Sequence, residues 1–297
     1  MKHCAKILKV LFVIYFVAAL FSGCSAVQQA YFFDDSGTAE TGSTQTDTLT
    51  VQYIDVGQAD AALLTCGGDA MLIDGGNVAD GQLVADTVSA SAEKLNYVVN
   101  THAHEDHCGG LTQVVESIEV ENAIISQKGA DTKCYTNFIN ALEERNVYTV
   151  QAEPGMEFAL GDAACTVIGP TAKSKELNNT SVVLRVDYAG KVFLFMGDAE
   201  NAEERAIIQA GYDVKCDVLK AGHHGSDTSS GYVFLREAQP EYVIISVGAN
   251  NKYGHPDGNT LSRFRDVGAA VYRTDQSGSI TAVSYTHLRA HETPEHL

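Results

Sequence analysis

The sequence predicts a single α/β domain. Apolar residues that alternate at strand spacing interleave with apolar residues at helical spacing along most of the chain. No internal repeat is visible at the ~20 to 50 residue periods of solenoids. No linker-like stretch interrupts the chain after Asp47, and 45% of the 297 residues are hydrophobic, which is enough for one sizeable core. We therefore expect one domain over residues 48–282.

The first part of this domain consists mainly of predicted strands. Residues 48–54 alternate between apolar and polar side chains, which predicts a strand with one covered face. Two short apolar runs, 61–64 and 71–73, are joined by a glycine turn and predict a pair of strands. Apolar residues at helical spacing over 81–95 predict a helix, and the apolar segment 97–99 predicts the next strand.

The second part alternates helices with strands, each marked by the same two spacings. The predicted elements are a helix at 136–145, strands at 182–186 and 192–196, a helix at 202–210, strands at 214–219 and 242–247, and a last helix at 261–267. A loop at 221–231 and a short helix separate the last two strands. This alternation is typical of helices packed against sheets.

The N-terminus has the order of features found in a bacterial export signal. Lysines precede an apolar run at 10–21, and small residues with Cys24 follow it, so residues 1–23 are predicted to be a signal peptide. The run is shorter than the ~20 residues that a spanning helix needs. Residues 20–24 resemble a lipobox, which implies lipidation of Cys24 and anchoring to the outer side of the cell membrane; plain secretion is the alternative. The polar, small residues of 24–47 predict a flexible tether.

Charge restricts the choice of partners. The net charge of −18 argues against an open basic surface for nucleic acid, because duplex binding relies on Lys and Arg that neutralise phosphates. An acidic protein can still cleave nucleic acid if metal ions hold the phosphate.

The mature domain carries five cysteines, an odd number without a CxxC pair, so no disulfide framework is implied. A single bridge is compatible with export, but the sequence does not say which two cysteines would form it.

The last residues do not continue the pattern of the domain. Residues 285–297 carry three histidines without periodicity, and residues 283–293 look like a translated sequencing adapter. We predict that residues 283–297 are a non-native tail.

The strongest functional signal is the segment Thr101-His-Ala-His-Glu-Asp-His107. His102 and His104 are two residues apart and project on the same side of an extended chain. Asp106 and His107 can turn toward a second point, so one short loop can supply two neighbouring metal ions. Imidazole and carboxylate suit zinc, or a harder ion such as manganese. We predict these four residues to be metal ligands.

Two further segments supply candidate ligands. Asp198 ends a strongly apolar strand, where its carboxylate can bridge two cations. In Gly222-His-His-Gly-Ser226, adjacent side chains point opposite ways, so one histidine can bind metal while the other faces substrate. We favour His223 as the ligand and His224 as a proton donor or substrate contact; the opposite assignment stays open.

Seven motifs, in order, resemble the metallo-β-lactamase fold superfamily, and specifically the ComEC-type hydrolase domain of competence proteins. The similarity runs from about Val51 to Ala282. The motifs are Ile54-Asp-Val-Gly-Gln-Ala-Asp60, Leu72-Ile-Asp-Gly-Gly76, Thr101 to Gly110, Asn178 to Leu184, Phe195 to Ala199, Leu219 to Ser226, and Ser246 to Pro256. The resemblance implies an αββα sandwich with the metals at one edge of the paired sheets.

The chain also departs from this family. Ala59 replaces a usual glycine, and Cys108 replaces a usual apolar residue. Many relatives have a third metal-binding histidine before Asp198, where this chain offers Asn178 and Asn179. Amide oxygens are weaker zinc ligands, so we expect these two to be weak ligands and the first metal to be loosely held or to be manganese.

The expected activity is hydrolysis by a hydroxide that bridges two divalent metal ions, zinc or manganese. Asp106 would both bind metal and orient the hydroxide. A phosphate ester is the expected bond, which makes DNA or another phosphate ester the expected partner, with Lys252 and His255 predicted to hold the anionic substrate. No protein partner is predicted.

Three other functions compete with a phosphodiesterase or nuclease. One is an esterase acting on envelope polymers such as phosphorylcholine-decorated teichoic acid. A β-lactamase fits less well, because the motifs differ from those of true lactamases. The third is a metal-binding lipoprotein without turnover, against which the intact ligand set argues.

Overall fold

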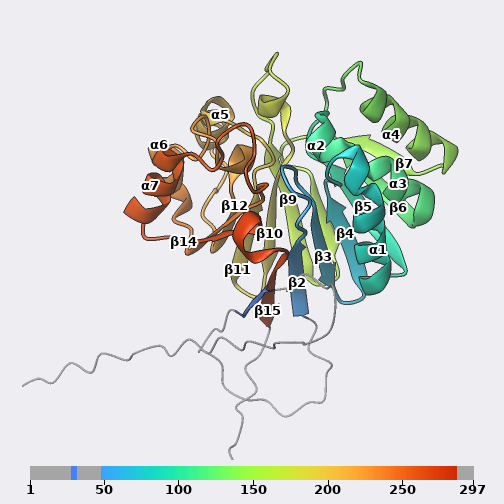
Figure 1. Ribbon diagram of the computed structural model, residues 1–297, viewed down its shortest axis with the longest axis horizontal. Helices are drawn as coiled ribbons and strands as arrows, with labels where there is room; N and C mark the ends of the chain where they lie inside the picture. The colour runs from blue at the N-terminus through green and yellow to red at the C-terminus, as the bar shows by residue number, and fades with distance from the viewer. Residues whose placement is uncertain (1–27, 32–47, 286–297) are drawn as a thin grey trace, which may run out of the picture.

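Two β-sheets pack face to face, and helices cover the outer face of each sheet (Figure 1). The computed structural model of the protein describes residues 28–31 and 48–285. The αββα sandwich implied by the resemblance is confirmed. Within these two ranges, no helix is long and apolar enough to cross a membrane.

The first sheet has eight strands, and its central strands come from the first half of the chain. In spatial order they are β1 (Gln28–Tyr31), β15 (Ile280–Tyr285), β2 (Thr48–Tyr53), β3 (Ala62–Cys66), β4 (Asp69–Ile73), β5 (Lys94–Asn100), β6 (Glu119–Ile125) and β7 (Tyr148–Gln151). The run from β4 to β7 is parallel. The carboxyl ends of these four strands therefore lie at one edge.

The second sheet has seven strands and repeats this design with the second half of the chain. In spatial order they are β14 (Ala270–Arg273), β13 (Tyr242–Ile245), β12 (Val218–Lys220), β11 (Lys191–Phe195), β10 (Val183–Tyr188), β9 (Ala163–Gly169) and β8 (Glu157–Leu160). The run from β11 to β14 is parallel.

The helices fall into two groups, one on each side of the sandwich (Figure 1). The first sheet carries α1 (Gly81–Ser91), α2 (Glu105–Cys108), α3 (Leu111–Ser117) and α4 (Lys133–Glu144), and the second carries α5 (Asn201–Gln209), α6 (Tyr232–Ala238) and α7 (Gly258–Asp266). Shorter turns are α8 (Thr274–Ser277) and the 3-10 helices η1 (Val78–Asp80), η2 (Asn178–Thr180) and η3 (Gly222–Gly225).

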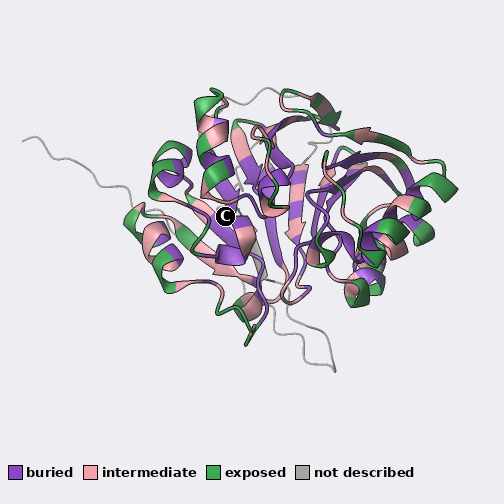
Figure 2. Cartoon of the chain, turned by 90° about the horizontal axis from the view of Figure 1, so that it is seen from above, coloured by how far each residue is buried: buried purple, intermediate pink, exposed green. Residues whose placement is uncertain are grey.

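Three apolar cores hold these layers together. The inner core lies between the sheets and includes Tyr53, Met71 and Phe195. The two outer cores lie beneath the helices and include Phe138 of α4 and Phe264 of α7. Buried residues accordingly fill the centre of the molecule, and exposed residues lie on the outer helices (Figure 2). The site loops are thus attached to a rigid frame.

The predicted element boundaries are wrong in several places. The helix expected over 81–95 ends at Ser91, and Leu95 is buried in strand β5 instead. The strand expected over 214–219 is confined to Val218–Lys220. Strands β7, β8 and β9 lie within residues 146–169, where no element is predicted from the sequence. The strands β7 and β8 have four residues each, too few for an alternating pattern to stand out.

The two ends of the chain are described only in part. Cys24, the predicted signal peptide and most of the predicted tether lie outside the described residues. Residues 28–31, within the predicted tether, form β1 and pair in parallel with β15. Strand β15 continues to Tyr285, three residues past the predicted domain end at 282, and its last residue pairs with Thr48 of β2. The origin of the residues that follow stays a prediction.

Candidate metal centre

Polar side chains gather where the parallel strands of both sheets end. Asp74 follows β4, residues 101–107 follow β5, Asp198 follows β11, and η3 follows β12. Carboxyl ends of parallel strands share one edge of a sheet, and the face-to-face packing brings the two edges together. Residues far apart in the sequence thereby meet at one point.

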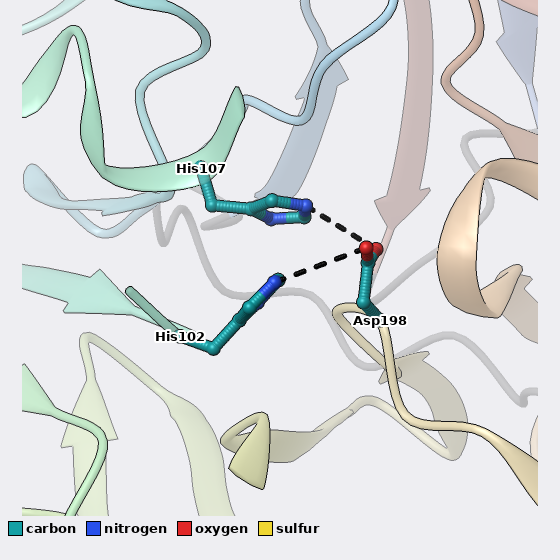
Figure 3. A group of neighbouring side chains, drawn as sticks. All are labelled: His102, His107 and Asp198. Carbon is teal, nitrogen blue, oxygen red and sulfur yellow. Dashed lines mark ion pairs between the residues drawn. The ribbon is translucent and has the colours of Figure 1, made fainter. Parts of the chain in front are cut away.

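Asp198 lies at the centre of this group and is 2% exposed. Its Oδ1 lies 3.2 Å from Nε2 of His107, and its Oδ2 lies 3.8 Å from Nε2 of His102. Figure 3 shows both imidazoles pointing at the carboxylate from the same side. The two oxygens of Asp198 therefore face different histidines, as a bridging carboxylate requires.

The two histidines of η3 approach the two carboxylate oxygens of Asp198. Nε2 of His224 lies 3.7 Å from Oδ1 of Asp198 and 3.4 Å from Oδ2 of Asp106. Nε2 of His223 lies 3.7 Å from Oδ2 of Asp198. Asp106, His107 and His224 thus lie on the side of Oδ1 of Asp198, and His102 and His223 lie on the side of Oδ2.

The group formed by Asp106, His107, His224 and Asp198 has the donor atoms that a divalent cation needs. Nε2 of His107, Nε2 of His224 and Oδ1 of Asp198 are buried side-chain atoms without a hydrogen-bond partner. Buried polar atoms are nearly always paired, so a group of three unpaired atoms calls for a ligand. Asp106, His107 and His224 offer ligand atoms within 4.8 Å of one another, as do His102, His107 and Asp198. This donor set is typical of zinc, manganese or iron.

The geometry bears on the choice between the two histidines of η3. His224 is 2% exposed and belongs to the clusters of potential ligand atoms, whereas the side chain of His223 is 24% exposed and belongs to none. These observations favour the opposite assignment, which the sequence left open, with His224 as the ligand and His223 as the residue that faces outward. Both adopt left-handed φ values of 49° and 52°, which is rare for residues with a Cβ and is found at functional sites.

His104 and the two asparagines take different places. Nδ1 of His104 lies 2.9 Å from Nε2 of His102, so these two rings converge at the exposed side of the centre. Asn179 donates to Glu200 at 3.0 Å and accepts from the Glu200 backbone at 3.1 Å, so it is engaged in holding the loop. Nδ2 of Asn178 lies 3.3 Å from Nε2 of His223, whereas the buried Oδ1 of Asn178 has no hydrogen-bond partner. Of the two expected weak ligands, only Asn178 has a free oxygen.

Asp74 orients His107, a role that the sequence analysis does not assign. Oδ2 of Asp74 lies 2.8 Å from Nδ1 of His107, which leaves Nε2 of the same ring directed at Asp198. Asp74 also accepts hydrogen bonds from the backbone and the hydroxyl of Thr101, at 2.8 and 2.6 Å. A carboxylate behind a ligating histidine fixes its tautomer and raises its basicity.

Asp60 and Lys220 form the corresponding support behind His224. Oδ1 of Asp60 lies 3.3 Å from Nδ1 of His224, which also lies 3.0 Å from the carbonyl of Ser246. Nζ of Lys220 donates to Oδ2 of Asp60 at 2.7 Å, and both side chains are buried. Neither role is predicted from the sequence, because Asp60 and Lys220 are 160 residues apart and each by itself is an ordinary polar residue in a turn or at the end of a strand.

Four carboxylates, those of Asp60, Asp74, Asp106 and Asp198, lie against the histidines of the centre. Burial lowers the pKa of His107, but the carboxylates of Asp198 and Asp74 outweigh it and hold that pKa well above its usual value. Burial likewise opposes protonation of His224, while Asp198 and Asp60 raise its pKa to about 10. For His102, burial and neighbouring His107 lower the pKa well below its usual value. Carboxylates that attract protons to buried imidazoles will attract a divalent cation in the same way.

The predicted substrate residues lie beside the exposed half of the centre. The ring of His255 is 5.7 Å from the ring of His223, centroid to centroid. Tyr253 stacks on His255, and Nζ of Lys252 lies 5.0 Å from the centroid of the Tyr253 ring. His255 is thus near the site, whereas Lys252 reaches it only through Tyr253.

Comparison with known proteins assigns the fold to a family. A profile of the beta-lactamase superfamily domain matches residues 70–247, which include every predicted metal ligand. The chain belongs to the beta-lactamase superfamily. Within this superfamily it is 31% identical over 189 residues to ComE operon protein 3 of Bacillus subtilis and 31% identical over 230 residues to competence protein ComA of Neisseria gonorrhoeae.

These alignments cover 63% and 76% of the chain but only 24% and 31% of the two relatives, so the chain spans about a quarter to a third of their length.

Solved structures of the superfamily share the sandwich at low sequence identity. YhfI of Bacillus subtilis, a metallo-beta-lactamase fold protein, has a TM-score of 0.53 at 12% identity and covers 80% of this chain and 100% of its own. Igni18, a metallo hydrolase of Ignicoccus hospitalis, has a TM-score of 0.53 at 17% identity. The match covers 79% of this chain and 98% of Igni18. CmlA, a diiron beta-hydroxylase of Streptomyces venezuelae, has a TM-score of 0.52 at 14% identity. The match covers 81% of this chain and 55% of CmlA. These similarities concern the fold alone.

Proposed function

We propose that this protein is a metal-dependent phosphodiesterase, with DNA as its first candidate substrate, held at the outer side of a bacterial membrane by a lipid on Cys24. The observation that carries the proposal is the buried group of unpaired ligand atoms on His107, His224 and Asp198. Two divalent cations, when bound, would supply charge that activates water and stabilises a phosphoryl group under attack.

The residues of the chain contribute position and protonation. Asp74 and Asp60 hold the Nδ1 sides of His107 and His224, so the Nε2 atoms of both rings are presented to the centre. His223 faces outward, and its Nδ1 lies 3.1 Å from the hydroxyl of Thr228 in the following loop. We assign to His223 the contact with the leaving group, because His224 is too deeply buried to reach it.

The choice of a phosphate ester rests on two supports. The Neisseria gonorrhoeae relative is named a competence protein, and a Haemophilus influenzae protein that is 27% identical over 239 residues is named a recombination protein. Both processes involve DNA. Two divalent cations held by these ligands would also stabilise the attacking and the leaving oxygen of an in-line displacement at phosphorus.

One observation favours a second candidate. A net charge of −18 repels a polyanion, whereas a phosphorylcholine ester carries a compensating positive charge. An envelope esterase is therefore the alternative, and it uses the same centre.

The test is hydrolysis by the purified protein, stripped of metal and reloaded with zinc, manganese or iron. The substrates are bis-p-nitrophenyl phosphate, single-stranded DNA and p-nitrophenyl phosphorylcholine. We expect metal-dependent hydrolysis of the first two, with a loss of at least roughly 100-fold in Asp198→Asn. The matched control is Asp213→Asn, which changes a carboxylate whose side chain is 69% exposed. Hydrolysis of the phosphorylcholine substrate alone would select the esterase, and stoichiometric metal without turnover would contradict both enzymes.

A further inference from the structure

Two cysteine thiols lie in contact beside the metal centre. Sγ of Cys108 is 3.9 Å from Sγ of Cys134, although the two residues are 26 positions apart. Cys108 is the last residue of α2, directly after His107, and Cys134 is the second residue of α4. Both belong to the apolar core beneath the helices of the first sheet. We propose that these two thiols are a disulfide site whose oxidation fastens the ligand-bearing helix α2 to α4.

The placement of α2 gives the bond a mechanical consequence. This helix has four residues and carries both Asp106 and His107. A single helical turn has almost no stability of its own, so its orientation depends on what it packs against. By contrast, α4 has twelve residues and buries Phe138 and Leu142 in the core. A covalent bond from the end of α2 to the first turn of α4 would therefore fix the short element to a rigid one.

The two thiols differ in how an oxidant can reach them. Cys108 is 0% exposed, and Cys134 is 9% exposed. Cys134 lies in the first turn of α4, directly after the exposed residues 131–133. Cys134 should therefore react first, and Cys108 should act from inside the core.

The chemistry balances with a small disulfide such as oxidised glutathione. The sulfur of Cys134 attacks one glutathione sulfur, and the first glutathione leaves as a thiol. Cys108 then attacks Sγ of Cys134, the Sγ–Sγ bond forms, and the second glutathione leaves. Two protein thiols are oxidised, one glutathione disulfide is reduced to two thiols, and the two protons end on those thiols. The sulfurs must close from 3.9 Å to about 2.0 Å, which needs only a small movement of side chains.

The test uses the full chain without substrate, so it does not depend on the proposed function. Reduced protein is freed of reductant, incubated with oxidised glutathione, alkylated, digested and analysed by mass spectrometry. We expect a peptide pair linked through Cys108 and Cys134 and the loss of two alkylable thiols. The midpoint of thermal unfolding should rise by roughly 5 to 10 °C, and dithiothreitol should reverse the rise.

Two cysteine variants test whether the disulfide forms between Cys108 and Cys134. Cys134→Ala should abolish both the linked peptide and the thermal shift, whereas Cys165→Ala, which changes a buried cysteine of another core, should retain both. Alkylation of both thiols after oxidation would overturn the proposal, as would a stable glutathione adduct on Cys134 with Cys108 still free. A linked peptide without a thermal shift would overturn the claim that the bond fastens α2.

Discussion

At the scale of single residues, the centre depends on pairs in which one carboxylate stands behind one imidazole. Asp74 contacts His107, and Asp60 contacts His224. Each pair fixes the proton on Nδ1 of the imidazole, so that Nε2 faces the metal centre. We therefore expect the supporting carboxylates to contribute to metal affinity.

Asp74→Asn tests the first pair. Asparagine tolerates the left-handed φ of 56° at this position, so the backbone should be retained. Because an amide is a weaker acceptor than a carboxylate, we expect metal affinity to fall by about 10- to 100-fold. Competition with a chelator gives the Kd, with Asp213→Asn as the exposed control. An unchanged Kd would show that Asp74 does not orient His107.

Lys220→Met tests the support behind His224. The ammonium of Lys220 and the carboxylate of Asp60 are buried together, and removal of the ammonium takes away the nearest positive charge to this carboxylate, at 2.7 Å against 3.3 Å for His224. We expect the free energy of unfolding of the metal-free protein to fall by about 3 to 5 kcal/mol, measured by urea denaturation. Asp60→Asn removes the carboxylate charge that Lys220 neutralises. The double variant should therefore lose less free energy of unfolding than the sum of the losses in the two single variants. Additive losses would contradict this pairing.

At the scale of elements, the ligand segment is positioned by glycine contacts as well as by strands. Gly109 and Gly110 follow α2, and the Gly110 backbone packs against Gly75 in the loop after β4. Gly110 also donates from its backbone to the carbonyl of Gly76 at 3.1 Å. The absence of side chains lets two site loops lie directly on each other.

Gly110→Ala tests this close approach. A methyl group on Gly110 would overlap the carbonyl oxygen of Gly75, so the backbone must shift. We expect the free energy of unfolding to fall by about 1 to 3 kcal/mol, together with weaker metal binding. Gly258→Ala at the start of α7 is the matched control, because nothing lies within 4 Å of its added methyl group. Equal stability of the two variants would contradict the packing argument.

At the scale of the whole molecule, stability depends on pH through a buried acid outside the centre. Glu204 of α5 is 2% exposed and accepts hydrogen bonds from the backbone of Ser230 and Gly231. Burial raises the pKa of Glu204 from its ordinary 4.5 to about 7, although these hydrogen bonds and Arg263 limit the rise. The folded protein therefore holds a proton that the unfolded chain has released between these two pH values.

The sign of the effect follows from proton counting. Where the folded state binds more protons, stability falls as pH rises, so the contribution of Glu204 is lost between pH 4.5 and about 7. The loss amounts to about 3 kcal/mol. As the pH rises from about 5 to about 8, the free energy of unfolding of Glu204→Gln should increase by this amount relative to that of the parent, as measured by urea denaturation. Exposed Glu237→Gln should show no such gain, and parallel pH profiles for Glu204→Gln and the parent would refute the assignment.

The class of fold and the main ligand segment were predictable from the sequence. Strand and helix spacings are local properties, so they indicated an α/β domain and the strand before Thr101. The spacing of His102, His104 and His107 is equally local, as is the position of Asp198 after an apolar strand.

The way in which these segments meet became clear only from the tertiary structure. His223 and His224 are neighbours in the chain, and their left-handed backbone, not an extended one, sends His224 to Asp106 and leaves His223 outside. Asp60 and Lys220 are 160 residues apart, so no local pattern reveals that they form a pair. The contact of Cys108 with Cys134 likewise arises because α2 and α4 cover the same sheet. Contacts between distant residues are set by sheet order and packing, and neither is written in the spacing of residues along the chain.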